Sequence, residues 1–161
     1  MKEMKKIITA FMLALVCMTG FAQNAAKDIY TRYSGREGVS SVYVSPAMFK
    51  LIRKLPDLSV SGENVNLTNI VKELEGLYIL NTGEGSLGKA LSEDAEKMIR
   101  SGKLEVMMEA NEGGTKTRMY VAEKDGIVSE LVLYTKEPGE VTLISVCGKM
   151  RMEDLAGLLE D

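Results

Sequence analysis

The chain has 161 residues, of which 20 are basic and 23 acidic, and it contains two cysteines and no histidine. The lack of histidine excludes Ser-His-Asp and Cys-His catalysis, histidine-ligated zinc and a histidine pH switch. A formal net charge of −3 also makes the chain a poor candidate for binding the phosphate backbone of nucleic acids.

The N-terminus has the three-part pattern of a secretory signal peptide. Three lysines lie among the first six residues, residues 7–17 are almost entirely apolar, and Gly20 and Ala22 are the small residues that a signal peptidase recognises. We therefore expect cleavage between Ala22 and Gln23, with residues 1–22 as the signal peptide and residues 23–161 as a single α+β domain. The apolar run is shorter than the ~20 residues of a bilayer-spanning helix, so we expect no stable membrane span after cleavage.

A lipid anchor through Cys17 is an alternative. Bacterial lipid attachment prefers a small residue before the modified cysteine, whereas Val16 stands there, and cleavage after Ala22 would remove Cys17. We expect an exported protein that resides in the periplasm, with lipid anchoring through Cys17 or full secretion as the alternatives.

Cleavage would change the charge and the cysteine content. Removal of residues 1–22 takes away three lysines and Glu3, which leaves 17 basic and 22 acidic residues and a net charge of −5. The mature chain keeps only Cys147, so it can form no internal disulfide, although an exported compartment would permit one. The remaining chain is long enough to bury a hydrophobic core without such a crosslink.

The first part of the mature chain predicts a helix, a strand and a second helix. Apolar residues at helical spacing indicate a short helix within residues 26–33, and β-branched residues predict a strand over residues 39–44. Ser45 is a typical N-cap, Pro46 suits the first helical position, and Pro56 ends the helix that they begin.

Two further apolar stripes predict two more helices. One covers residues 67–74 and ends at Gly76, and the other covers residues 87–99 and ends at Gly102. Between them, the short apolar run of residues 77–80 predicts a strand.

From residue 104 onward the apolar period changes from that of a helix to that of a strand. Turn signals at residues 111–114, 125–126 and 138–139 divide this part into four strands, and turns so short cannot join parallel strands. A short helix after residue 151 ends the chain. The predicted fold class is α+β: an antiparallel meander sheet of about four to six strands, with helices packed on one face and the other face partly wet.

Two segments carry a resemblance to a known family. Residues 33–48, which include the strings YSGREGV and SVYVS, and residues 74–80, LEGLYIL, resemble an exported bacterial family filed as domain of unknown function 4252. The resemblance spans most of the mature chain. It implies a Gram-negative envelope setting, a fold close to the one predicted above and a link to envelope stress, but no established activity and no catalytic residues.

The glycine-rich segment 83–90 satisfies the pattern G-x-G-x-x-G and nearly satisfies that of a phosphate-binding loop. It lies between a predicted strand and a predicted helix, where backbone N–H groups can hold phosphate. However, Ala90 offers no hydroxyl group to magnesium, and the meander that follows lacks the parallel units of nucleotide-binding folds. We interpret the segment as a strand-to-helix loop and expect no cofactor.

Cys147 shares its predicted strand face with Val141 and Leu143. No histidine is available to activate its thiol, so we interpret Cys147 as a small buried hydrophobic residue and not as a nucleophile.

Carboxylate chemistry is the remaining catalytic possibility. Three acid pairs are close in sequence: Glu93-Asp94, Glu153-Asp154, and Glu105 with Glu109. A glycosidase needs two acids that face each other across a cleft, whereas adjacent acids at helix starts favour the helix dipole. Glu105 and Glu109 are predicted to share the wet face of one strand. No pair specifies a catalytic site.

Metal binding is not favoured either. No clustered oxygen-ligand loop of the calcium type occurs in the sequence. The pairs Met107-Met108 and Met150/Met152 offer ligands that suit Cu(I), but methionine is more often a filler of hydrophobic cores. We interpret the basic triplet of Lys50, Arg53 and Lys54 as a solvated helix face.

These exclusions favour a non-catalytic cell-envelope protein that acts as a binding or interaction module. Its partner would be an unknown envelope protein or ligand, bound by the wet sheet face or by an edge strand that accepts a strand of the partner. The alternative is a carboxylate-based hydrolase of envelope material. A concave cleft with two inward-facing acids would favour the hydrolase, and a flat sheet face would favour the binding module. The sequence leaves the oligomeric state open.

Overall fold

A computed structural model of the chain describes residues 25–54, 67–83, 85–102 and 104–156. Its elements in chain order are α2 (Ala25–Tyr33), β1 (Val39–Val44), α3 (Pro46–Ile52), α4 (Leu67–Lys72), β2 (Leu74–Gly83), α5 (Ser86–Ser101), β3 (Glu105–Glu112), β4 (Thr115–Lys124), β5 (Ile127–Glu137), β6 (Glu140–Arg151) and α6 (Met152–Ala156). The predicted cleavage site at Ala22 and Gln23, the alternative anchor Cys17, and Pro56 lie outside the described residues.

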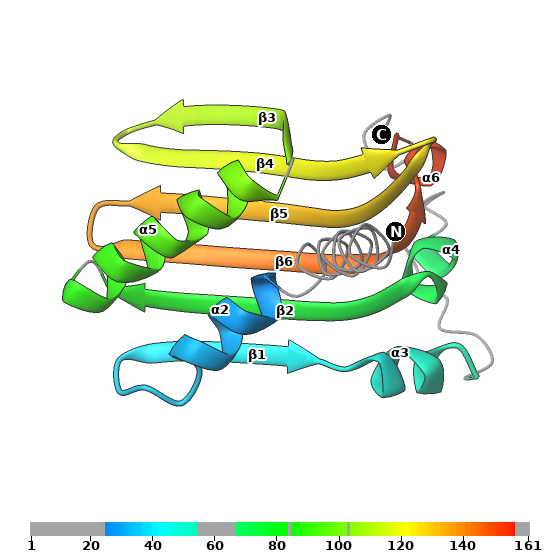
Figure 1. Ribbon diagram of the computed structural model, residues 1–161, viewed down its shortest axis with the longest axis horizontal. Coiled ribbons are helices and arrows are strands. Elements are labelled where there is room, and N and C mark those ends of the chain that lie inside the picture. Colours follow the sequence, from blue (N-terminus) through cyan, green and yellow to red (C-terminus); the bar gives the residue numbers. More distant parts are fainter. Residues whose placement is uncertain (1–24, 55–66, 84, 103, 157–161) are drawn as a thin grey trace, which may run out of the picture.

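The six strands form one antiparallel sheet in the order β1-β2-β6-β5-β4-β3. After β2 the chain crosses the sheet as α5, enters the far edge strand β3 and returns by a meander to β6, which pairs with β2 (Figure 1). Helices α2 and α5 pack on one face of the sheet. The predicted fold class, α+β with an antiparallel sheet, is confirmed, whereas the expectation that all helices pack on one face is wrong, because α4 and α6 contact the other face at its end.

The main core lies between this face and the two helices. Leu91 and Ala95 of α5 are fully buried, and Ile29 and Tyr33 of α2 are nearly so. They pack against alternate residues of the central strands, among them Leu80, Leu143 and Val132. The helical stripe of residues 87–99 thus faces the sheet as predicted, because its apolar side chains recur every three to four positions.

Local sequence signals account for several element ends. The Ser45 side chain accepts a hydrogen bond from the backbone N–H of Met48, and Pro46 begins α3, as expected of an N-cap followed by proline. Asp125 and Gly126 have φ angles of 55° and 79°, the left-handed conformations of a tight hairpin turn.

The helix predicted over residues 67–74 ends earlier than expected. Helix α4 stops at Lys72, and Leu74 already begins the ten-residue strand β2, where it pairs with Gly148 of β6. The backbone N–H of Lys149 donates to the carbonyl of Glu73 at 3.0 Å. A Cβ atom on Gly148 would lie 2.4 Å from that carbonyl oxygen, so the close pairing of the strands requires glycine at this position. Pairing with β6, which is distant in sequence, therefore places in the sheet residues that the local pattern assigned to a helix.

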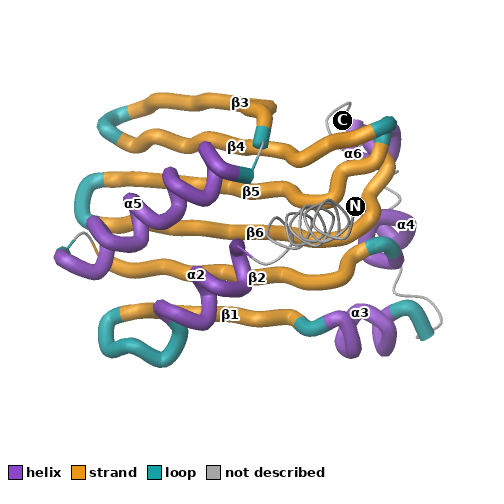
Figure 2. Tube along the Cα trace, viewed as in Figure 1, coloured by secondary structure: helices purple, strands orange, loops and turns teal. Residues whose placement is uncertain are grey.

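A second, smaller core lies on the opposite face of the sheet, at one end. It contains Val121, Val128, Met150 and Leu155, with Ile70 of α4 packed against it. Figure 2 shows α3, α4 and α6 gathered at this end of the sheet. The short helices α4 and α6 thus contact the face that α2 and α5 leave free, but only at its end.

Candidate binding surface

An uninterrupted row of apolar side chains crosses the sheet on the face opposite α2 and α5. In pairing register from β1 to β3, the row consists of Val42, Ile79, Ile144, Leu133, Met119 and Met108. Val42 is 49% exposed and Met108 45% exposed, and the four residues between them are half-buried. None of these six residues belongs to either hydrophobic core or is among the partly buried residues packed against one. We call these six residues the open face.

The open face exists because several strands are apolar on both sides. Residues 77–80 and 131–134 are continuous apolar runs, which put alternate side chains into the main core and onto the open face. The sequence pattern predicted a packed face and a partly wet one, but the described wet face is apolar at its centre. Contiguous apolar surface of this kind is typical of interaction sites.

A polar row borders the open face and satisfies its own hydrogen bonds. The side-chain amide of Asn81 donates to the hydroxyl of Thr142 at 2.8 Å and to the carboxylate of Glu140. The hydroxyls of Thr117 and Thr135 lie 3.4 Å apart and share a hydrogen bond. Among the described residues, no buried side-chain polar atom lacks a partner. The surface therefore offers apolar contact rather than a set of converging polar groups.

On the helix-covered face, Cys147 belongs to a small cluster with Ser145 and Glu130. The Ser145 hydroxyl donates to a Glu130 carboxylate oxygen at 2.8 Å and lies 3.8 Å from the Cys147 sulfur. Burial raises the pKa of Glu130, and the hydrogen bond from Ser145 only partly opposes this. Burial, followed by the nearby Glu130 charge, raises the pKa of Cys147 to about 11. The thiol therefore stays protonated at neutral pH, as expected of a structural cysteine.

We expect Cys147 to alkylate slowly in the folded protein. With its pKa near 11 instead of 9, the thiolate is about 100-fold less abundant at neutral pH than in an unfolded chain. The measurement compares iodoacetamide rates for the full chain carrying Cys17→Ser, in buffer and in denaturing urea. The folded state also loses stability as pH rises above 9 and through 11, because its pKa is the higher one. Cys147 is half-buried and not fully buried as the sequence predicted, and equal rates in the two solvents would contradict even this partial protection of the thiol.

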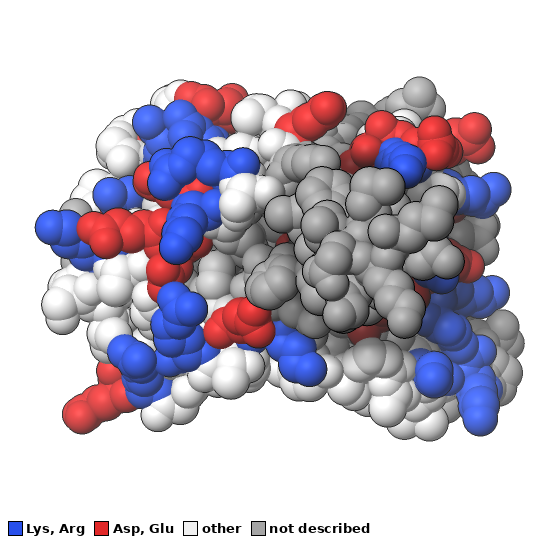
Figure 3. All heavy atoms as spheres, in the orientation of Figure 1, with Lys and Arg blue, Asp and Glu red and all other residues white. Residues whose placement is uncertain are grey.

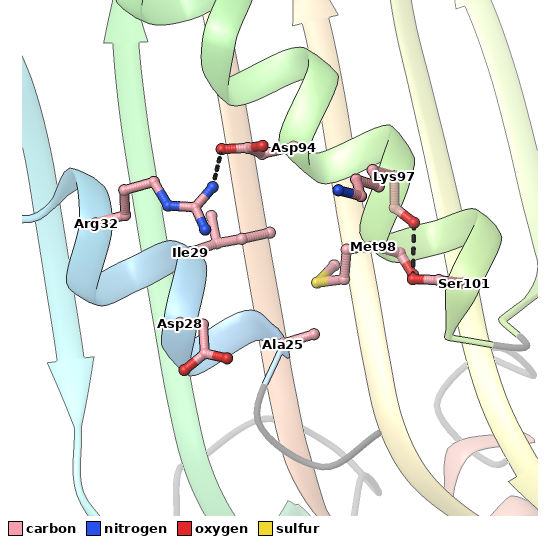
Figure 4. Close-up of a pocket in the computed structure, with 8 residues that line it drawn as sticks. All are labelled: Ala25, Asp28, Ile29, Arg32, Asp94, Lys97, Met98 and Ser101. Atoms are coloured by element: carbon pink, nitrogen blue, oxygen red, sulfur yellow. Dashed lines mark hydrogen bonds and ion pairs between the residues drawn. The ribbon is translucent and has the colours of Figure 1, made fainter. Parts of the chain in front are cut away.

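A shallow groove lies between α2 and α5 (Figure 4). Its volume is about 180 Å³, below the ~300 Å³ at which small-molecule pockets usually begin. The Arg32 guanidinium donates to the Asp94 carboxylate at 2.6 Å, and the Tyr33 hydroxyl donates to the same oxygen at 2.7 Å. Burial alone would raise the pKa of Asp94, but these hydrogen bonds outweigh it and lower the pKa. Asp94 is thus an ionised link between the two helices.

The second acid of the groove, Asp28, lies one helical turn before Arg32 on α2 (Figure 4). Both acids line the groove, together with the basic residues Arg32 and Lys97. A carboxylate held ionised by two donors cannot serve as the general acid that glycoside hydrolysis requires. The geometry of this groove therefore favours a structural contact over hydrolysis.

The structure separates Glu105 from Glu109, which the sequence pattern placed on one strand face. The pairing of β3 with β4 shifts by one residue at Met107, so Glu105 pairs with Val121 and Glu109 pairs with Arg118. Val121 and Arg118 lie on opposite sides of the sheet. The prediction of a shared face is wrong because a β-bulge inverts the alternation of side chains.

The other two acid pairs have different surroundings. Glu153 and Asp154 lie in the first turn of α6, as predicted. Glu93 and Asp94 instead lie within the continuous helix α5, so an explanation by a helix start is wrong for them. Asp94 links α5 to α2 through its hydrogen bonds with Arg32 and Tyr33, and Glu93 is exposed.

The glycine-rich segment has a packing explanation. Gly88 is buried in α5, and a Cβ atom on it would lie 2.2 Å from the carbonyl oxygen of Gly83. Gly88 therefore allows the first turn of α5 to touch the end of β2. This contact supports the interpretation of the segment as a strand-to-helix loop.

The methionine pairs differ in burial. Met150 is 1% exposed in the second core, with Met152 packed against it, so the core-filler interpretation holds for this pair. Met107 and Met108 are instead exposed on the edge strand β3, so that interpretation is wrong for them. Among the described residues, no cluster of three Cys, Asp or Glu side chains could hold a metal ion.

The basic triplet and the helix-covered face show dispersed charge. Lys50 and Lys54 are exposed, as predicted, while Arg53 donates to the carbonyl of Leu74 at 3.0 Å and so contacts the start of β2. Basic and acidic side chains are interspersed over α5 (Figure 3). Such mixing does not favour binding to a phosphate backbone.

The fold and the open face together define a small α+β sheet domain with one partly uncovered apolar face. The family model described as Domain of unknown function (DUF4252) matches residues 33–158, and the chain belongs to this family. No curated protein and no solved structure matches the chain. In the described part of the chain, no helix has the length and hydropathy of a membrane span.

Proposed function

We propose that this protein is a non-catalytic, exported interaction module of the cell envelope that binds a protein partner through the open face. The observation that carries this proposal is the unbroken apolar row from Val42 to Met108 across all six strands. Leaving such a row in water costs about 25 cal/mol per Å² of apolar surface, and a partner recovers this free energy by covering it. A link to envelope stress forms part of the proposal through the family resemblance.

Export is supported by the N-terminal sequence. The positive start, the short apolar run and the small residues before Gln23 are the pattern of a cleavable leader. We propose the periplasm as the location, with an anchor through Cys17 or secretion as the alternatives. The intact mass of the exported protein separates these options, since cleavage gives an N-terminus at Gln23 and lipidation adds acyl mass to Cys17.

The hydrolase alternative has less support. The acid pairs that are close in sequence do not form a catalytic pair in the structure. Glu105 and Glu109 lie on opposite faces of the sheet. Asp94 accepts hydrogen bonds from Arg32 and Tyr33. The thiol of Cys147, with its pKa near 11, is also unsuited to nucleophilic attack.

The proposal is tested by site-specific photo-crosslinking in Gram-negative cells that express the full chain. The photoreactive residue replaces Met108 on the open face or, as the matched control, Val106 on the same strand and the opposite face. Both positions are exposed, at 45% and 59%, so neither replacement should disturb folding. We expect a discrete crosslinked product from position 108 and none from position 106. Equal products at both positions, or none at either, would contradict a role for the open face.

A further inference from the structure

Helix α3 presents apolar side chains to the solvent. Its sequence, PAMFKLI, contains a single charged residue, Lys50. Phe49 is buried and fixes the helix to the rest of the domain, whereas Met48 and Leu51 are 48% and 54% exposed. Because these two residues are three positions apart, they lie side by side on the outer side of the helix. A surface helix usually has the reverse arrangement, with its apolar side chains inward and its polar ones outward.

Basic side chains border the apolar side of α3. Lys50 lies within the helix and Lys54 follows its end, and both are exposed. Residues 38–54 contain no aspartate or glutamate. Figure 3 shows lysine and arginine side chains gathered at the corner of the molecule where α3 lies, at lower right. We call Met48 and Leu51, together with Lys50 and Lys54, the α3 patch.

The charges around the α3 patch are positive in sum. Arg53 donates to the carbonyl of Leu74 at 3.0 Å, so the end of α3 lies beside the start of β2. The exposed charged side chains at that point are Lys72, Glu73 and Glu75. With Arg53 and the two lysines of the patch they make four basic and two acidic groups, a net charge of +2. Charges more than about 8 Å away are largely screened at physiological ionic strength, so this local charge outweighs the acidic total of the chain.

The size of the α3 patch favours a lipid surface over a folded protein as its partner. A standard protein–protein interface takes about 20–30 residues from each side and needs a matching shape. The patch offers two large apolar side chains on a short helix, which is far less. A bilayer surface needs no matching shape, because apolar side chains enter between the headgroups while lysines extend their stems and keep their charge beside anionic phosphates. An anionic bilayer therefore matches both the apolar and the basic part of the patch.

We propose that the α3 patch attaches the protein reversibly to the surface of an anionic lipid bilayer. This inference rests on the proposed envelope location, which places the protein beside such bilayers, but it uses a surface other than the open face. Met48 and Leu51 enter the boundary between headgroups and acyl chains, and Lys50 and Lys54 contact the lipid phosphates. Because only two large side chains enter the bilayer, the attachment is weak and the protein exchanges between bilayer and solution.

The test is co-sedimentation of the exported protein with lipid vesicles. The protein is purified after expression of the full chain with Cys17→Ser, which removes any acyl anchor, and intact mass verifies the same N-terminus in every variant. One set of vesicles contains phosphatidylcholine with about one third phosphatidylglycerol, and the other contains phosphatidylcholine alone. We expect at least tenfold stronger binding to the anionic vesicles at low salt. About 0.5 M NaCl should remove most of this difference, because it screens the charges.

Two double variants separate the two parts of the α3 patch. Lys50→Gln/Lys54→Gln removes two charges and should weaken binding to the anionic vesicles about 25-fold, which is about fivefold for each charge. Met48→Gln/Leu51→Gln keeps the charges but removes the apolar side chains that enter the bilayer, and should weaken binding at least tenfold. All four residues are exposed, so we expect the denaturation midpoint of both variants to stay that of the wild type.

The matched control is Lys116→Gln/Lys136→Gln. It removes the same charge from two exposed lysines that pair across β4 and β5, away from α3, and should change binding by less than twofold. The proposal is overturned if the wild type binds anionic vesicles no better than neutral ones, or binds neither, as expected if α3 contacts an acidic protein instead. It is also overturned if the control weakens binding as much as the α3 lysines do. These outcomes leave the open face untouched, because photo-crosslinking at position 108 detects a protein partner independently of lipid.

Discussion

Replacing Gly88 with alanine is expected to lower the free energy of unfolding by about 2–4 kcal/mol. The added Cβ atom would lie 2.2 Å from the backbone oxygen of Gly83, and a backbone atom cannot move aside as a flexible side chain can. Alanine favours a helix over glycine by about 1 kcal/mol, because it has the higher helix propensity. This gain is too small to offset the cost of moving α5 away from β2. Urea denaturation followed by circular dichroism measures the difference.

The matched control is Gly85→Ala, three residues earlier in the same glycine pattern. A Cβ atom on Gly85 would have no neighbour within 4 Å, so we expect a change below about 1 kcal/mol, of the size typical for an N-cap position. If both variants lost stability equally, or if neither did, the close contact between α5 and β2 would not be the reason for glycine at position 88.

Leu91→Ala is expected to cost about 2–5 kcal/mol, because it leaves a cavity in the main core. Leu91 is 0% exposed and lies on the side of α5 that faces the sheet, in one cluster with Ile29 of α2, Leu80 and Leu143. The loss should appear as a lower denaturation midpoint with an unchanged slope, since the variant removes contacts without changing the surface exposed on unfolding.

Leu51→Ala provides the control for this second prediction. Leu51 lies on α3 and is 54% exposed, so we expect its replacement to change stability by less than about 0.5 kcal/mol. A comparable loss for both leucines would mean that the core does not lie between α5 and the sheet.

Much of the fold could be predicted because its signals are local. Ser45 and Pro46 mark a helix start through one side-chain hydrogen bond and one fixed dihedral angle, and Asp125-Gly126 marks a hairpin turn through its positive φ angles. The stripe within α5 indicates its buried side by spacing alone. None of these features depends on a residue far away in the chain.

The errors in the sequence prediction come from long-range pairing. Leu74 fits the apolar stripe of the preceding helix, but β6 draws it into the sheet opposite Gly148. The apolar residues of β3 alternate without a break. The sequence pattern therefore does not predict the bulge at Met107 that separates Glu105 from Glu109. Register and bulges are decided by the partner strand, which the local pattern does not contain.

Only part of the open face could be predicted from the sequence. The run Leu131-Val132-Leu133-Tyr134 shows that β5 is apolar on both sides, a pattern typical of strands with two packed faces. Which side of the sheet stays exposed depends on where the helices α2, α4, α5 and α6 pack. The same reasoning explains why the link from Arg32 to Asp94, across 62 residues of sequence, could not be inferred.

The irregular edge strand β3 has a consequence for how far the protein can assemble. Its carboxylates at Glu105, Glu109 and Glu112 and its bulge at Met107 disfavour the addition of an identical strand, which would lengthen the sheet without limit. The bulge and the charges of this one edge strand therefore disfavour open-ended association of chains through their sheets.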